Sequence, residues 1–158
     1  MNQGPNPYPP PAPYQASPYG VPVANRTPFV LAAAGAWLAS AYWAVMTGLL
    51  GLGAMLGSGS VAQIILPVVL IGLYAMRGFQ IFKGDPNAAR RILWLHGIGA
   101  VAALIQALGS FATGSALVAG LQGMKVVINV FGGITAYYAY RSYVEAMRQP
   151  AVAPYGTP

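Results

Sequence analysis

The chain has 158 residues, of which eight are Lys or Arg and two are Asp or Glu. Only 6% is therefore charged and 56% is hydrophobic, whereas an ordinary soluble domain has roughly 25% charged residues with which to cover its surface. This composition excludes a water-soluble globular protein and indicates an integral membrane protein. The net charge of +6 does not indicate a nucleic-acid partner, because the basic residues lie singly beside apolar segments and form no dense patch.

The N-terminal segment, residues 1–27, differs in composition from the rest of the chain. Residues 1–28 hold nine of the 14 prolines and three Pro-Tyr pairs. Such a segment buries little apolar surface, so we expect a disordered cytoplasmic tail with polyproline II character. The C-terminal tail, residues 145–158, resembles it, since residues 153–158 repeat the pattern of residues 17–22.

The repeated Pro-Tyr pairs have two interpretations. Composition alone favours a solubilising low-complexity tail. The functional alternative is a docking motif for a protein partner, because Pro-rich segments bind aromatic grooves. The candidate docking residues are Pro13, Tyr14, Pro18, Tyr19, Pro154 and Tyr155.

Residues 28–144 form the predicted transmembrane domain. The 50 residues between Arg26 and Arg77 carry no charge, which is enough for two spans of about 20 residues and a turn. A Gly-Ser cluster at residues 57–60 marks that turn, and a second small-residue cluster lies at 109–115. The predicted fold is an all-α membrane protein, a four-helix bundle built as two helical hairpins. Its spans are about 29–55, 61–81, 92–112 and 117–140, with a hydrophilic connection at 83–91.

The basic residues predict the orientation. They precede the first span, surround the connection between the second and third spans, and follow the fourth span. The two hairpin turns have none. Positively charged loops stay in the cytoplasm, so we expect both termini to be cytoplasmic. The first span is too long and too far from the start for a cleaved signal peptide, which makes it an uncleaved anchor. Short loops favour a bacterial plasma membrane.

Lys125 is the only charged residue in the third and fourth spans, between residues 92 and 140. It lies near the outer end of the fourth span, and the favoured interpretation is that its ammonium reaches the outer headgroups. Alternatively it faces the bundle interior, because Gln122 and Asn129 share its helical face. This alternative predicts a polar seam, and the candidate residues are Gln63, Gln106, Gln122, Lys125 and Asn129. His96, the only histidine, is expected to be an interfacial hydrogen-bonding residue.

The small number of titratable and metal-ligating residues argues against an enzyme. General acid–base catalysis uses paired titratable groups, and both acidic residues, Asp85 and Glu145, lie in polar segments where we expect solvated carboxylates. Metal sites use several His, Cys or acidic ligands, and the chain has one His and no Cys. We therefore expect no catalytic residues, no cofactor and no metal.

Two functions remain. The first is a non-catalytic structural or protein-interaction component of the membrane, whose partners are membrane lipids and a protein bound through the tails. The alternative is a small transporter or channel subunit for an anion or small polar solute. It would act as a homo-oligomer, because four helices enclose little volume.

Overall fold

The computed structural model describes residues 25–57, 60 and 62–148, and the only regular secondary structure among these residues is α-helix. The four helices are α1 (Thr27–Met55), α2 (Ala62–Phe82), α3 (Pro86–Ala112) and α4 (Ala116–Arg148). All four are long and apolar enough to cross a membrane. The all-α class and the presence of four helices long and apolar enough to cross a membrane are therefore confirmed. The tail residues 1–24 and 149–158 lie outside the described residues.

Two helices extend further than the predicted spans. α3 begins at Pro86, six residues before the predicted span. The Asp85 carboxylate accepts hydrogen bonds from the backbone N–H groups of Asn87 (2.9 Å) and Ala88 (3.2 Å), and proline at the first helical position suits the start of a helix. Most of the segment expected as a hydrophilic connection is thus helical. α4 likewise continues through Glu145 to Arg148, beyond the apolar residues that define its span.

Glycines make the sharp reversals between helices. Gly84, between α2 and α3, has φ +92°, and Gly114, between α3 and α4, has φ +74°. Only glycine adopts this left-handed conformation without strain, which is why it commonly follows the last turn of a helix.

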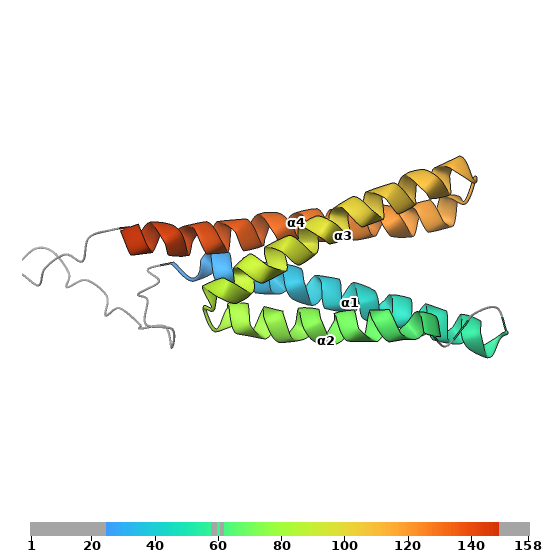
Figure 1. The fold of residues 1–158 in the computed structure, drawn as a ribbon, viewed down its shortest axis with the longest axis horizontal. Coiled ribbons are helices and arrows are strands. Elements are labelled where there is room, and N and C mark those ends of the chain that lie inside the picture. Colours follow the sequence, from blue (N-terminus) through green and yellow to red (C-terminus); the bar gives the residue numbers. More distant parts are fainter. Residues whose placement is uncertain (1–24, 58–59, 61, 149–158) are drawn as a thin grey trace, which may run out of the picture.

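The helices form two pairs that share one end (Figure 1). α1 packs along α2, α3 packs along α4, and α1 also contacts α4, whereas α2 and α3 touch only sparsely. We call the end with the start of α1, the Lys83–Asp85 connection and the end of α4 the closed end. At the opposite, open end, the two pairs diverge.

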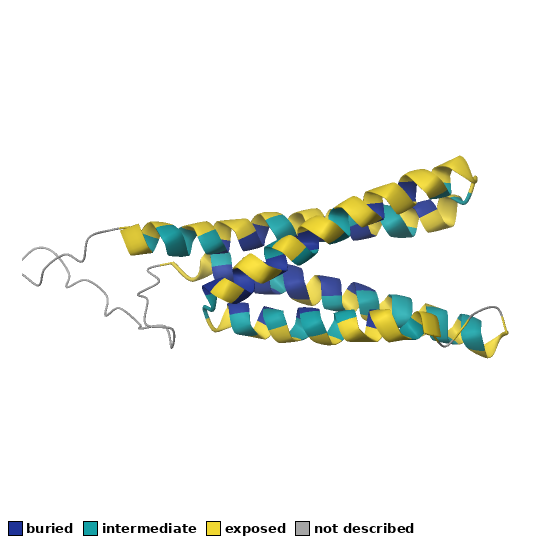
Figure 2. Ribbon diagram, viewed as in Figure 1, coloured by how far each residue is buried: buried dark blue, intermediate teal, exposed yellow. Residues whose placement is uncertain are grey.

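The buried residues gather toward the closed end (Figure 2). They are mostly small, and the core cluster comprises Phe29, Ala32, Ala33, Ala36, Ala39, Tyr74, Ile81, Ala88, Ala89, Ile92, Ala136 and Ala139. Large aliphatic side chains instead point outward along the helices, for example Val45 and Leu104. This inverted distribution suits lipid, which solvates Leu and Val and leaves small residues to pack the helices together.

Gly35 and Gly132 bring the backbones of α1 and α4 into direct contact. A Cβ atom added at Gly35 would lie only 2.8 Å from the Cα atom of Gly132. Gly78 of α2 has a similar role, since a Cβ there would lie 2.6 Å from the indole nitrogen of Trp37. The α1–α4 contact between the two pairs and the α1–α2 contact within one pair therefore both depend on positions that lack a side chain.

We expect Gly35→Leu to lower the free energy of unfolding by about 1–3 kcal/mol, because the new side chain must force α1 away from α4. Gly48→Leu is the matched control, since Gly48 is exposed on the same helix and an added Cβ meets nothing within 4 Å. The measurement is unfolding by sodium dodecyl sulfate titrated into mild-detergent micelles, followed by circular dichroism. Equal losses in the two variants would contradict the close approach.

Candidate functional site

A polar cluster centred on Asn129 lies inside the bundle and joins three helices. The Asn129 side chain on α4 is 4% exposed. Its Oδ1 accepts a hydrogen bond from the Tyr74 hydroxyl of α2 (3.3 Å) and lies 3.1 Å from Nδ1 of His96 on α3. Its amide nitrogen donates to the carbonyl of Lys125 one turn earlier (2.8 Å). Because Oδ1 can only accept, the His96 contact requires the proton on Nδ1.

Glycines on the facing helix make room for this cluster. A Cβ atom at Gly99 of α3 would lie 2.6 Å from Oδ1 of Asn129, and one at Gly132 of α4 would overlap the His96 imidazole. Each large polar residue thus faces a glycine across the α3–α4 contact. Asn129 fits only because Gly99 opposes it, and His96 fits only because Gly132 does.

His96 is fully buried within the bundle and makes a hydrogen bond as expected, to Asn129. The early start of α3 places it ten residues into the helix, and its ring packs on Tyr74 with the centroids 5.0 Å apart. Nε2 of His96 has no hydrogen-bond partner among the described residues. The hydrogen bond to Asn129 therefore fixes the Nδ1 edge of the imidazole ring. The lone pair of Nε2 remains free to accept a hydrogen bond.

Lys125 faces the bundle, so the favoured expectation of an outward-reaching ammonium is not what the structure shows. The residue is 8% exposed. Its ammonium lies 3.4 Å from Oε1 of Gln106 on α3 and 4.7 Å from the ring centroid of Trp43 on α1. A cation over an indole face gains electrostatic attraction without a counter-charge. The ammonium is thus held by an amide and an aromatic ring.

The structure brings some of the candidate seam residues together and separates others. Lys125, Asn129 and Gln106 form a connected set. Gln122 lies one turn before Lys125, and its Oε1 is buried without a partner among the described residues. Gln63 is exposed at the start of α2, where its Oε1 faces the backbone N–H of Ser60 at 3.5 Å. The candidate docking residues of the two tails lie outside the described residues.

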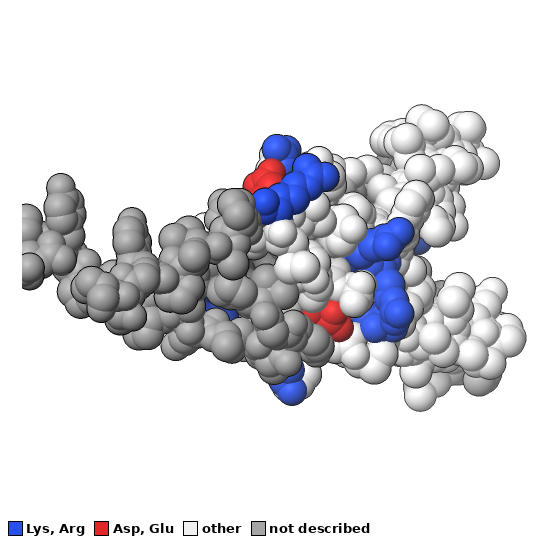
Figure 3. All heavy atoms as spheres, turned by 60° about the vertical axis from the view of Figure 1, so that its left-hand side comes forward, with Lys and Arg blue, Asp and Glu red and all other residues white. Residues whose placement is uncertain are grey.

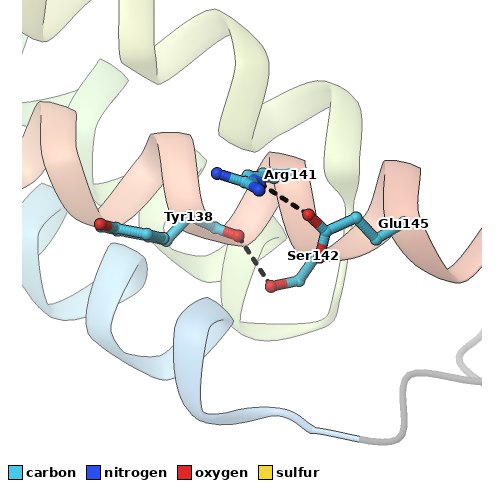
Figure 4. A network of polar contacts seen from close by, with 4 residues as sticks. All are labelled: Tyr138, Arg141, Ser142 and Glu145. Carbon is cyan, nitrogen blue, oxygen red and sulfur yellow. Dashed lines mark hydrogen bonds and ion pairs between the residues drawn. The ribbon is translucent and has the colours of Figure 1, made fainter.

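Neither acidic residue of the chain is near Lys125. Asp85 caps the start of α3. Glu145 accepts a hydrogen bond from Nε of Arg141 at 2.6 Å on the exposed last part of α4, beside the Ser142 hydroxyl, which donates to the Tyr138 carbonyl at 2.8 Å (Figure 4). Because the chain has only these two acids, the Lys125 ammonium has no carboxylate partner. Nor do three His, Cys, Asp or Glu side chains gather anywhere in the described part of the chain as metal ligands would.

Sequence reasoning missed Tyr74, His96 and Trp43 as members of the cluster. For His96 a signal was present. His96 and Gly132 each lie 18 residues from Gly114, and Gly99 and Asn129 each lie 15 residues from it. In two antiparallel helices joined by a tight turn, such positions face each other, so large polar residues opposite glycines indicate the pairing. Tyr74 and Trp43 belong to the α1–α2 pair. Counting residues from the turn between α3 and α4 does not predict which residues of the other pair these helices meet.

The chain matches no known protein-family model, no curated protein and no solved structure. The cluster itself is suited to holding helices in register, because each hydrogen bond joins groups that would otherwise face acyl chains.

Asn129→Leu should lower the free energy of unfolding by about 1–3 kcal/mol, because it leaves the Tyr74 hydroxyl and His96 Nδ1 unpaired and crowds Gly99. Lys125→Met should change it little, since it removes a buried charge that has no carboxylate partner. Steric trapping or denaturant titration in bicelles measures both. A severe effect of Lys125→Met together with a mild effect of Asn129→Leu would refute this ranking.

Proposed function

We propose that this chain is a non-catalytic, multi-pass plasma-membrane protein that acts as a structural or protein-interaction component, with partners docked by its Pro-Tyr tails. The observation that carries the proposal is the use of the buried Asn129 side chain to join three helices, whereas Nε2 of His96 and Oε1 of Gln122 have no partner among the described residues. Asn129 uses its side chain to join Tyr74, His96 and the Lys125 backbone. Polar groups committed in this way hold a bundle together, whereas catalysis needs groups free to engage a substrate.

The distribution of charge supports an orientation for the proposed protein. On the face shown in Figure 3, the basic residues gather toward the closed end, and the tips of the open end carry none. Lys and Arg accumulate on the cytoplasmic side of membrane proteins. We therefore propose two helical hairpins with the closed end, and with it both termini, in the cytoplasm of a bacterial cell. Both tails would then be available to the same cytoplasmic partner.

A transporter or channel subunit is the second candidate, and Lys125 favours it. A buried ammonium without a carboxylate, next to the Gln106 amide, is chemically suited to an anion or a small polar solute. The interior is filled near Asn129, so a route would have to run between copies of the chain in a homo-oligomer.

The proposed orientation predicts the labelling of single cysteines. Thr113→Cys, at the exposed turn of the open end, should react with an impermeant maleimide in intact cells. Asn87→Cys, exposed at the closed end, should react only after the membrane is opened. The native chain has no cysteine, so it serves as the negative control for labelling. Labelling of Asn87→Cys in intact cells would exclude the orientation.

The docking proposal predicts that partners depend on the Pro-Tyr pairs. Proximity labelling from the intact protein should recover a partner set that is lost when Pro18, Tyr19, Pro154 and Tyr155 are all changed to Ala. The matched control changes Asn2, Gln3, Gln15 and Thr157 to Ala, which alters the same tails and spares every Pro-Tyr pair. An unchanged partner set, combined with solute flux through proteoliposomes that Lys125→Met abolishes, would replace this function with transport.

A further inference from the structure

A groove of about 240 Å³ lies between α2 and α3 near the closed end. It exists because α2 and α3 separate soon after their connection at Lys83–Asp85. Two arginines and four aliphatic side chains line it: Leu73, Arg77, Arg91, Ile92, Leu95 and Ile98. Arg77 and Arg91 each lie seven residues from Gly84, so the antiparallel helices carry them at the same depth, on opposite walls of one groove.

In the described part of the chain, neither guanidinium group has a carboxylate to neutralise it. Asp85 caps α3, Glu145 pairs with Arg141 on α4, and the chain has no other acid. Arg77 donates one hydrogen bond to Oε1 of Gln80 (2.7 Å), which leaves most of its five N–H donors available. Arg91 is exposed and has no hydrogen-bond partner among the described residues. Two like charges that share a groove favour the binding of an anion there.

The rest of the groove is apolar and extends away from the closed end. Leu95 and Ile98 follow Arg91 by one and two turns of α3, and Leu73 precedes Arg77 by one turn of α2. By helix rise, Arg77 lies about 7 Å inside the end of α2, the depth of the boundary between headgroups and acyl chains. The cationic part therefore lies at headgroup level and the aliphatic part at acyl-chain level.

We propose that this groove binds one anionic glycerophospholipid, with Arg77 and Arg91 on its phosphate and the first part of an acyl chain along Leu73, Leu95 and Ile98. The inference rests on the proposed membrane embedding. Basic pockets between membrane helices suit anionic headgroups, and arginine binds phosphate oxygens in a forked, bidentate manner. Free phosphate would use the arginines alone and leave the aliphatic wall without a partner, so the lipid is the occupant that fits the whole groove.

The test measures binding of phosphatidylglycerol to the intact protein in mild detergent by native mass spectrometry, with phosphatidylcholine and inorganic phosphate as comparison probes. We expect one tightly bound phosphatidylglycerol and much weaker phosphatidylcholine. Arg77→Gln and Arg91→Gln should each weaken phosphatidylglycerol binding roughly fivefold or more. Arg90→Gln is the matched control, because it removes the same charge from a neighbouring exposed position that does not line the groove, and it should bind like the native protein.

A second variant keeps the charges and blocks the acyl-chain path. Ile98→Trp changes an exposed position, 68% accessible, on the groove wall, so folding should survive while phosphatidylglycerol binding weakens. Equal losses in Arg90→Gln and Arg91→Gln, unchanged binding in Ile98→Trp, or displacement of the lipid by millimolar phosphate would each overturn the proposal. Binding in detergent does not depend on orientation or on tail partners. A failure here therefore leaves the proposed function standing, and a failed labelling experiment leaves this measurement valid.

Discussion

The close approach of helix backbones at small residues is the constraint on which the rest of the structure depends. Lipid solvates leucine as well as another helix does, so apolar area alone does not hold these helices together. Contact between α1 and α4 is instead made where Gly35 meets Gly132 and where alanines line the core. These residues concentrate toward the closed end, and larger side chains cover the outer parts of the helices. The helix pairs therefore pack at one end and separate at the other.

The polar cluster follows from the same constraint. Gly132 leaves space on two sides of α4, for the backbone of α1 near Gly35 and for the imidazole of His96. Asn129 meets His96 across the close α3–α4 contact, and the long Tyr74 side chain reaches it from α2. Interhelical hydrogen bonds in membranes contribute only about 0.6 kcal/mol each on average. Their greater effect is on register, because a shift of one residue along α4 would set Asn129 against Ile98 or Ala100 in place of Gly99.

Hydropathy and charge were sufficient to find four spans, because apolar runs separated by glycine clusters leave few alternatives. The predicted span begins six residues after the start of α3, since hydropathy reports the apolar segment, whereas the helix begins where Asp85 caps it. The fourth-helix face with Lys125 and Asn129 was visible in the periodicity. The direction of the Lys125 ammonium was not, because it depends on how the pair containing Trp43 rotates against the pair containing Gln106. That rotation is set by tertiary packing.

The scarcity of acids accounts for how the cations are distributed. The chain has eight Lys and Arg residues but only two acidic side chains. The Asp85 carboxylate caps a helix, and the Glu145 carboxylate pairs with Arg141 at the surface. Basic residues toward the closed end do not need protein carboxylates if anionic headgroups surround them, and the Arg77–Arg91 groove is where two such charges converge on one site. Lys125 lies too far along α4 to share those headgroups, so an indole face and an amide oxygen surround its ammonium. Because the chain has so few acids, the proposed partner of Arg77 and Arg91 is a lipid phosphate, and the partners of Lys125 are an indole ring and an amide.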